Sequence, residues 1–491
     1  MEVKALAKQR EGNESCNRLQ TPSAMIRTFS ASFTTLLALA ATLMAEEPLK
    51  LHPDNPHYFL FRGKPEVLIT SGEHYGAVLN AEFDFLKYFD ALASDGLNLT
   101  RVFPGCYVEP EGAFNIERNT LAPAEGKLIC PWARSGEAGY VHGGNKFDLT
   151  KWDEAFFTRL RDCVAAAGKK GIVVEMNLFT PMYEDPQWDY SPMKASNNIN
   201  GIGKVGKHEV HTLDKEPALL GVQEEMTRKI VRELNEFDNV YYEVMNEPYF
   251  GGVTQAWHDR ITDVILATEK DLPNKHLISW NVANDTAKVD KPHPGISIFN
   301  FHYAQTSAVT DNIALNKPLG MNETGFKGTG DEYYRIQAWE FMLSGGALYN
   351  NLDYSFCVGH EDGDFPVKDP TPGGGGIGFR KQMRNLGEFL RKFKFIQLKP
   401  DRSFVKGNLA KSGGFTSMAQ TGKQYAVYLK GGGGTALELE LPKGNYAGEW
   451  LDAISGERKA IDPIKHAGGA VTLTAPGFPK DFALRLVSDK R

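Results

Sequence analysis

The stretch NVYYEVMNEPYF, which spans Asn239–Phe250, decides the fold of this chain. Its first half is rich in β-branched and aromatic residues and has no helical period, which predicts a buried strand. Pro248 has no backbone N–H and a fixed φ, so the strand must end just before it. Glu247 is therefore expected at the carboxyl end of a strand, and in parallel α/β barrels this end carries the active site.

A second stretch, KPLGMNETGF at Lys317–Phe326, has the same form: a short apolar strand, an Asn-Glu pair and a turn residue. Glu323 then ends a strand that comes three βα units after the strand of Glu247. In a ring of eight strands these two lie on opposite sides, so their last side chains can converge over its mouth. We expect the two carboxylates to face each other across a cleft.

Apolar strands alternate with amphipathic helices from about residue 67 to about residue 395, which predicts a parallel sheet. The number of strands and connections matches a closed (β/α)8 TIM barrel. Two connections, Pro104–Asp148 and Pro181–Lys215, are long and irregular, and loops of this kind often shape a substrate cleft. Polar or aromatic residues close to the ends of other strands are the remaining candidates for the cleft: His74, Arg101, Asn177, Trp280, His302, Tyr303 and Tyr354.

From about Leu398 the pattern changes to short strands of alternating polarity separated by glycine-rich turns, which predicts a small antiparallel β-sandwich. We therefore expect a catalytic barrel at residues 46–397 and a β-sandwich accessory domain at residues 398–491. The sandwich either covers and stabilises the barrel or binds a glycan or another partner.

The segment from Met25 to Ala45 has a positive charge, an apolar run and a small residue before Glu46-Glu47-Pro48. This pattern predicts a secretory signal peptide and a secreted or periplasmic protein. The apolar core is short for a bilayer, so the alternative, a membrane anchor, is less favoured, and we expect no membrane span in the mature protein. Residues 1–24 read as an upstream extension, and residues 1–45 are not expected to contribute to the fold.

The chain has 491 residues, of which 42% are hydrophobic, and a net charge of −6, which is ordinary for a globular protein. This charge, without a long basic run, gives no indication of nucleic-acid binding. Cys106 and Cys130 flank one loop and either form a disulfide or remain free thiols. No cluster of Cys and His has the spacing of a metal site, and we expect neither a metal nor a cofactor. The sequence leaves the oligomeric state open.

Cleavage of a glycosidic bond with retention requires two carboxylates, and these must come from different strands at one rim of the barrel. One carboxyl protonates the leaving oxygen and the other attacks the anomeric carbon, at a separation of ~5–5.5 Å. The attacking group needs a lowered pKa, and we expect Arg101 and Tyr303 to donate to Glu323 and keep it ionised. Asn246 is placed to hold a sugar hydroxyl.

Asn246-Glu247-Pro248 at one strand end, a Glu at another, Arg101 after the second strand and His302-Tyr303 after the sixth resemble clan A glycoside hydrolases, of which cellulase-like family 5 is the best known. The segment from HPDNPHYF to Arg101 resembles a group of bacterial glycosidases classified as a domain of unknown function (DUF4038-like). The C-terminal sandwich resembles the collagen-binding-like domain often attached to them. This resemblance implies that Glu247 is the acid/base, Glu323 the nucleophile, and Arg101, Asn246, His302 and Tyr303 their supporting residues.

The sequence departs from family 5 at two places. Asn177 stands near the end of the third strand, where these enzymes usually have a His. The eighth strand carries Tyr349 and Tyr354 where they usually have a Trp. The resemblance therefore implies the reaction more firmly than the substrate, and we expect a polysaccharide or oligosaccharide other than cellulose.

Two functions from different classes follow. The first is a secreted retaining glycoside hydrolase. The second is a non-catalytic glycan-binding or adhesion protein on a degenerate barrel, with the sandwich as its working part. The presence of both carboxylates favours the first.

Overall fold

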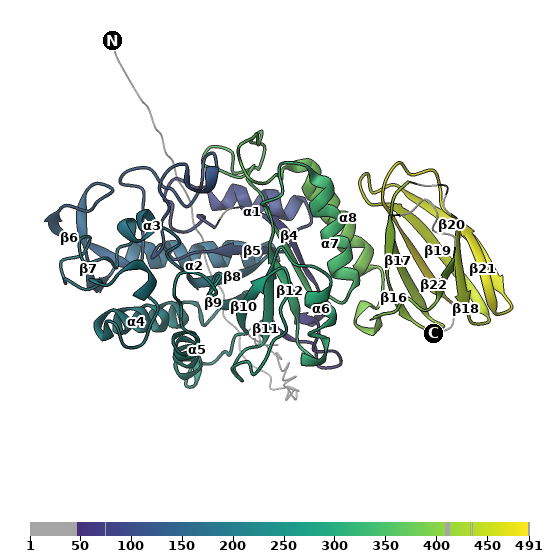
Figure 1. Ribbon diagram of the computed structural model, residues 1–491, viewed down its shortest axis with the longest axis horizontal. Helices are drawn as coiled ribbons and strands as arrows, with labels where there is room; N and C mark the ends of the chain where they lie inside the picture. Colours follow the sequence, from purple (N-terminus) through teal and green to yellow (C-terminus); the bar gives the residue numbers. More distant parts are fainter. Residues whose placement is uncertain (1–46, 74, 408–412, 433, 435, 490–491) are drawn as a thin grey trace, which may run out of the picture. The chain divides into compact units, whose positions relative to one another are not determined.

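Eight parallel strands form the predicted barrel in a computed structural model, which describes residues 47–73, 75–407, 413–432, 434 and 436–489. The predicted signal peptide and His74 lie outside the described residues. The neighbours in the sheet follow the order β4-β13-β12-β11-β10-β9-β8-β5 (Figure 1). The barrel strands are β4 (Leu68–Gly72), β5 (Leu99–Val102), β8 (Val173–Phe179), β9 (Val240–Met245), β10 (Ile278–Asn284), β11 (Ile298–His302), β12 (Leu319–Glu323) and β13 (Leu348–Leu352).

Asn98 joins the two ends of this sheet. Its backbone N–H donates to the carbonyl oxygen of Ile69 on β4 (3.3 Å), and its side-chain oxygen accepts from the Ile69 N–H (2.8 Å). Strand β5 begins at the next residue, so this double contact brings β4 and β5 together. The barrel is nearly closed, and the predicted TIM-barrel fold class is confirmed.

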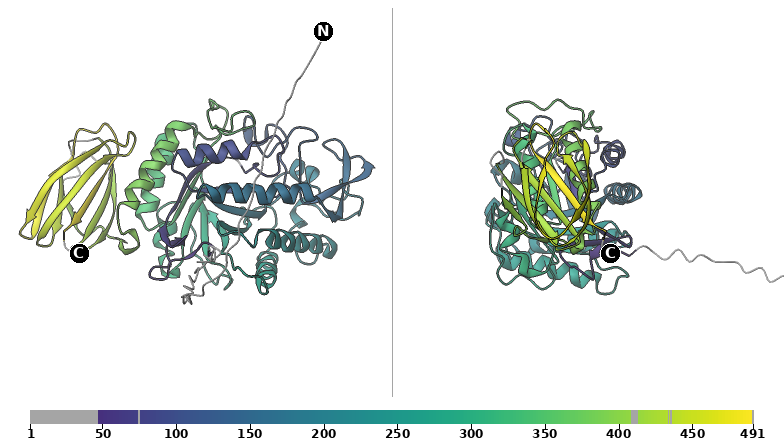
Figure 2. Two further views of the ribbon diagram at one scale, coloured as in Figure 1. Left: turned by 180° about the vertical axis from the view of Figure 1, so that it is seen from behind. Right: turned by 90° about the vertical axis from the view of Figure 1, so that its right-hand side faces the viewer.

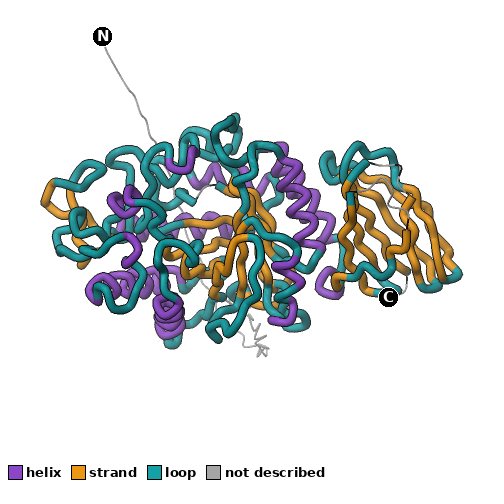
Figure 3. Tube along the Cα trace, in the orientation of Figure 1, coloured by secondary structure: helices purple, strands orange, loops and turns teal. Residues whose placement is uncertain are grey.

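Helices follow most of the barrel strands and lie outside them, as the purple and orange segments of Figure 3 show. In the view from behind, the purple helix α1 and the blue helix α2 run across the strands (Figure 2). Thr254 caps helix α5 (Gln255–Glu269), because its hydroxyl accepts from the Trp257 N–H (3.2 Å). The principal helices are α1 (Phe85–Ser94), α2 (Glu154–Lys169), α4 (Pro217–Leu234), α5 (Gln255–Glu269), α7 (Asp331–Leu343) and α8 (Ile377–Arg391); α3 (Asp185–Tyr190) and α6 (Ser307–Thr310) are short.

The long connection after β5 is more regular than its sequence indicates. It contains the antiparallel hairpin of β6 (Trp132–Ala138) and β7 (Asn145–Trp152). A small sheet of β1 (Lys50–Leu51), β2 (Phe59–Phe61) and β3 (Lys64–Glu66) precedes the barrel. Cys106 and Cys130 are buried free thiols, so the disulfide considered above is not formed. Among the described residues, we find no helix with the length and hydrophobicity needed to span a bilayer.

After α8, the described residues between 399 and 488 form only strands and loops (Figure 3). A six-stranded sheet has the order β14-β16-β17-β22-β19-β20, and a three-stranded sheet has the order β15-β18-β21. Both are antiparallel, as predicted. The strands are β14 (Lys399–Pro400), β15 (Val405–Gly407), β16 (Gly414–Gln420), β17 (Gln424–Lys430), β18 (Ala436–Leu441), β19 (Gly444–Asp452), β20 (Arg458–His466), β21 (Gly469–Thr474) and β22 (Phe482–Ser488).

The period of two along β17 places its side chains on two different faces. Tyr425 and Val427 lie in the core between the two sheets, whereas Tyr428 packs with the barrel core. The Tyr428 ring stacks on Trp339 of α7, with the ring centres 5.1 Å apart. Barrel and sandwich residues belong to one unit, Glu46–Arg491, and a domain boundary at residue 398 stays a prediction.

Candidate active site

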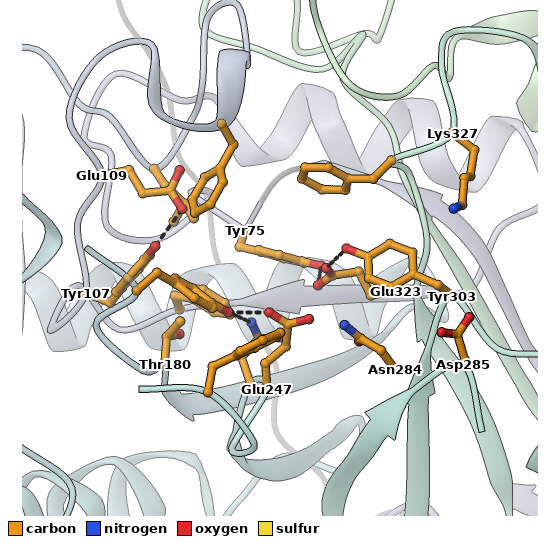
Figure 4. A pocket seen from close by; sticks show the side chains of 17 residues that line it. Tyr75, Tyr107, Glu109, Thr180, Glu247, Asn284, Asp285, Tyr303, Glu323 and Lys327 are labelled. Atoms are coloured by element: carbon orange, nitrogen blue, oxygen red, sulfur yellow. Dashed lines mark hydrogen bonds between the residues drawn. The ribbon is translucent and has the colours of Figure 1, made fainter. Parts of the chain in front are cut away.

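A cavity of about 400 Å³ opens at the carboxyl ends of the barrel strands. Figure 4 shows Glu247 and Glu323 near its centre, Tyr107 and Glu109 at one end, and Asp285 and Lys327 at the other. Aromatic and apolar side chains dominate its wall, with a few polar groups between them, which is typical of ligand sites. The lining residues are Tyr75, Phe103, Tyr107, Glu109, Phe114, Leu121, Thr180, Tyr183, Asn246, Glu247, Phe250, Asn284, Asp285, Tyr303, Glu323, Phe326 and Lys327.

Glu247 and Glu323 approach each other through His302. The Nδ1 atom of His302 lies 3.1 Å from Oε1 of Glu247 and 3.5 Å from Oε1 of Glu323. One oxygen of each carboxylate and one ring nitrogen of His302 all lie within 4.8 Å of one another. This closest approach of their oxygens is compatible with the ~5–5.5 Å that separates the two carboxyl groups of a retaining glycosidase.

The surroundings of Glu323 favour its ionised form. Tyr303 donates to Oε1 (2.7 Å), and Tyr75 (2.6 Å) and Arg101 (3.2 Å) donate to Oε2. Burial raises the pKa of Glu323, but His302, Arg101 and the two tyrosine hydroxyls outweigh burial and lower the pKa below its usual value. The donors Arg101 and Tyr303 are the two that the sequence analysis expects.

Glu247 has a different set of partners. The hydroxyl of Tyr183 donates to its Oε2 (2.6 Å), and the hydroxyl of Tyr249 lies 3.3 Å from its Oε1. Its backbone N–H donates to the side-chain oxygen of Asn281 on β10 (3.0 Å). The backbone at Glu247 has a φ of 42°, in the left-handed region that non-glycine residues rarely adopt. The Asn281 contact helps to hold this residue at the end of β9.

Arg101 lies fully buried beneath the pair and binds carboxylates from three strands. It donates to Glu175 of β8, to Glu243 of β9 (2.6 Å) and to Glu323 of β12 (3.2 Å). Burial would lower the pKa of Arg101, but the surrounding carboxylates raise it, so the guanidinium stays charged. Burial raises the pKa of Glu175 above its usual value. This network fixes the floor of the cavity and places a permanent positive charge next to Glu323.

Residues 130–341, which include both Glu247 and Glu323, match the model of the cellulase family, glycosyl hydrolase family 5. The chain is a family 5-like glycoside hydrolase. Family 5 is a retaining family, in agreement with the spacing of the two carboxylates.

Two solved structures share the fold of this family 5-like hydrolase. One is described as a glycoside hydrolase; it has a TM-score of 0.60 and 14% identity, and the match covers 91% of this chain and 98% of that chain. The other is a glycoside hydrolase family 5 protein from Bacteroides vulgatus ATCC 8482, with a TM-score of 0.60, 12% identity and coverage of 90% and 94%. At these identities the likeness shows the fold alone. A comparison with curated protein sequences finds no significant match.

The other expected residues of this family 5-like hydrolase divide into two groups. Asn246 lines the cavity, and its side chain contacts both Arg101 (3.1 Å) and the Tyr183 hydroxyl (2.9 Å). Tyr354 is buried and does not line the cavity. Burial raises the pKa of its hydroxyl, and the nearby carboxylate of Glu323 raises it further.

Asn177 and Trp280 do not reach the cavity. Asn177 is fully buried below it, where its side-chain amide donates to Glu243 (3.0 Å). Trp280 packs against His258 of α5 and Phe299 of β11, on the helix side of the sheet. Its neighbour Asn281 points into the barrel, and successive residues of a strand point to opposite faces. Trp280 is therefore not a sugar-stacking surface in this structure.

Several cavity residues were not predicted as site residues. Tyr75 and Tyr183 each donate to one of the two carboxylates, and both lie in the loops that directly follow barrel strands. The signal that marks them is this position after a strand, the same signal that marks Arg101 and Tyr303. Tyr107 and Glu109 lie in the long connection after β5, where no periodic pattern singles out individual residues.

Glu247, His302 and Glu323 form a set that is also able to hold a metal ion. The hydrogen bonds of these three residues favour a role without a metal ion. Both oxygens of Glu323 already accept from side-chain donors, and the charged Arg101 lies 3.2 Å from one of them. A fixed positive charge next to a ligand oxygen opposes cation binding, so the donors fit an ionised carboxylate without a metal.

Proposed function

We propose that this protein is a secreted retaining glycoside hydrolase that cleaves a polysaccharide or oligosaccharide by double displacement. Glu247 is the acid/base and Glu323 is the nucleophile. The observation that carries this assignment is the close approach of the two carboxylates in one cavity, where each has its own set of hydrogen-bond partners. Four donors and neighbours lower the pKa of Glu323, the group that must attack as an anion.

In the first step a carboxylate oxygen of Glu323 attacks the anomeric carbon and the glycosidic C–O bond breaks. Glu247 gives its proton to the leaving oxygen, so the aglycone departs as an alcohol. In the second step Glu247, now a carboxylate, removes a proton from water. The water oxygen then attacks the anomeric carbon, and the ester bond to Glu323 breaks. Two inversions at one carbon give net retention.

The neighbouring residues support these steps in separate ways. Arg101, Tyr75 and Tyr303 stabilise the negative charge of Glu323 before attack and after release. His302 lies between the two carboxylates and contacts both of them through Nδ1. Asn246 lies beside Glu247 at the cavity wall, where its amide is placed to bind a sugar hydroxyl.

The proposal includes export, for which the sequence between Met25 and Ala45 is the support. It also includes the finer relationship to the DUF4038-like glycosidases and their collagen-binding-like sandwich, which rests on the sequence stretches quoted above. A non-catalytic glycan-binding role is less well supported, because both carboxylates are present with their hydrogen-bond partners.

The test uses the mature chain and a panel of 4-nitrophenyl β-glycosides of glucose, mannose, galactose and xylose. We expect at least one probe to be cleaved, with NMR showing the β-anomer as the first product. Glu323→Gln and Glu247→Gln should each lower kcat by several orders of magnitude while thermal unfolding stays near that of the wild type. Full activity in either folded variant, or an inverted first product, would refute the assignment.

A further inference from the structure

One end of the cavity is closed by the long connection after β5. Tyr107, Glu109 and Leu121 from this connection line the cavity and are only 1%, 4% and 1% exposed. Thr180, which follows β8, is 3% exposed and lines the same cavity. In Figure 4, Tyr107 and Glu109 stand at the end opposite Lys327. A substrate chain that extended past Glu109 would have to displace buried side chains.

The connection that closes this end is fixed to the barrel. The Ile129 N–H donates to the Leu79 carbonyl oxygen (2.9 Å), and Ser191 donates to the Cys106 carbonyl oxygen (2.7 Å). Gly76 lies so close to this connection that an added Cβ would be 2.3 Å from the carbonyl oxygen of Thr120. These contacts come from both sides of the connection, so the closed end is a built wall of the cavity.

The opposite end is open. Asp285, Phe326 and Lys327 are exposed, and a second cavity of about 540 Å³ shares Asp285, Tyr303 and Lys327 with the first. The second cavity continues to Tyr333, a residue that is 44% exposed. An exposed ring beside a polar groove offers a stacking surface for a sugar. The site therefore extends away from the carboxylate pair in the direction of Asp285.

Glu109 is the charged group at the closed end. The Tyr107 hydroxyl donates to its Oε1 (2.9 Å), and the Asn119 side-chain amide donates to its Oε2. These donors hold the carboxylate in place, and an ionised carboxylate offers about four lone-pair sites to hydrogen-bond donors. A fixed carboxylate at the end of a sugar cavity is suited to accept hydrogen bonds from sugar hydroxyls. A terminal sugar has more free hydroxyls than a sugar within a chain, so such a carboxylate favours the terminal sugar.

We propose that the enzyme acts on chain ends, with Glu109 as the specificity-determining residue that binds the hydroxyls of the terminal sugar. This inference rests on the proposed function. The terminal unit occupies the closed end between Glu109 and the carboxylate pair, and the rest of the chain leaves through the groove lined by Asp285, Lys327 and Tyr333. The product is a short sugar released from one end of the substrate.

The first test follows products over time. The probes are oligosaccharides of β-1,4-linked glucose, mannose or xylose and of β-1,3-linked glucose, each reduced to the alditol at one end. We expect mass spectrometry to show one short product from the earliest time points and remaining chains shortened stepwise from one end. Early products from cleavage in the middle of the chain would overturn the inference.

The second test compares two glutamates of the same loop. Glu109→Gln keeps the shape and removes the charge, and should lower kcat/KM on the cleaved oligosaccharide roughly 10- to 100-fold. Glu111, which is exposed and does not line the cavity, provides the control Glu111→Gln, and this variant should be unchanged. Tyr107→Phe removes one donor that holds Glu109 and should give a smaller loss with an unchanged Tm.

The outcomes separate the two proposals. If the wild type cleaves no probe, including the 4-nitrophenyl glycosides, the proposed function fails. If it cleaves with retention but cuts internally, or if Glu109→Gln and Glu111→Gln behave alike, only the inference about the chain end is wrong.

Discussion

The hydroxyl of Tyr303 lies 2.7 Å from Oε1 of Glu323, and the Tyr303 backbone adopts a left-handed φ of 51° at the position from which it makes this contact. Tyr75, the second tyrosine donor to Glu323, has a φ of 66°, and Glu247 has a φ of 42°. Left-handed backbone costs of order 1–3 kcal/mol at a non-glycine residue. Three such residues around one carboxylate pair indicate that the fold holds the geometry of the site at the expense of stability.

The Tyr303 contact predicts a change in pH dependence. Tyr303→Phe removes a hydrogen bond to the ionised form of Glu323, so the pKa of Glu323 should rise. The acid limb of kcat/KM, where activity falls as Glu323 takes a proton, should then move to higher pH by up to about one unit. The rate at the optimum should fall roughly 10- to 100-fold. An acid limb at the wild-type pH would contradict the role given to Tyr303.

Glu73 predicts a pH-dependent stability. It is buried, accepts from the Gly76 and Ala77 N–H groups (3.0 Å each), and burial raises its pKa from 4.5 to about 7. The folded state thus binds this proton more tightly than the unfolded chain does. The stabilisation is complete below pH 4.5 and is lost as the pH rises through 7, by roughly 3 kcal/mol at most.

In Glu73→Gln this titration is absent. The Tm of the variant, measured by calorimetry from pH 4.5 to 8, should therefore improve relative to the wild type as the pH rises. Parallel Tm curves for the two proteins would show that Glu73 stays ionised throughout.

Asp481 couples the sandwich to helix α7. It accepts two hydrogen bonds from Arg335 (2.6 and 2.8 Å) and one from Tyr428 (2.9 Å), and both charged side chains are 3% exposed. Asp481→Ala leaves the Arg335 charge buried and unpaired, which should cost about 3–5 kcal/mol of stability. Lys480→Ala, which removes an exposed ion pair with Glu332, is the matched control and should cost at most ~1 kcal/mol. Equal Tm losses would argue against a buried coupling.

Small anions should distinguish the two carboxylates. With azide and an activated 4-nitrophenyl glycoside, Glu323→Ala lacks the nucleophile, so azide attacks the anomeric carbon directly and gives a glycosyl azide of inverted configuration. Glu247→Ala still forms the intermediate on Glu323, so azide attacks from the other face and gives the retained configuration. NMR of the two products checks the assignment. The opposite pattern would exchange the two roles.

The site residues that the sequence predicts correctly share one feature, a position at the carboxyl end of a barrel strand. Arg101, Glu247, His302, Tyr303 and Glu323 each lie at or just after the carboxyl end of a barrel strand, and the structure brings all five into contact. The alternation of polar and apolar residues likewise indicates the antiparallel sheets after residue 398, because one face of each sheet must be buried. Strand β20 shows little of this alternation, since none of its residues is fully buried.

The remaining differences between prediction and structure come from features that the periodicity of the sequence does not encode. Trp280 and Asn281 are neighbours within β10, but only Asn281 points inward, because the face that each side chain takes depends on the register of the whole barrel. Asn177 points inward as expected, yet it lies below the cavity because Arg101 and Glu243 fill the same level of the barrel. Tyr107 and Glu109 are placed by an irregular loop, whose path depends on contacts with distant segments.

Capture of the covalent intermediate tests directly whether Glu323 is the nucleophile. Glycosides with fluorine at carbon 2 and an activated leaving group form the glycosyl-enzyme bond faster than water breaks it. After incubation with the 2-fluoro analogue of the cleaved sugar, peptide mass spectrometry should find one sugar on Glu323 and none in Glu323→Gln. A sugar attached to Glu247 or to another residue, or turnover without a trapped intermediate, would contradict the assignment of Glu323 as the nucleophile.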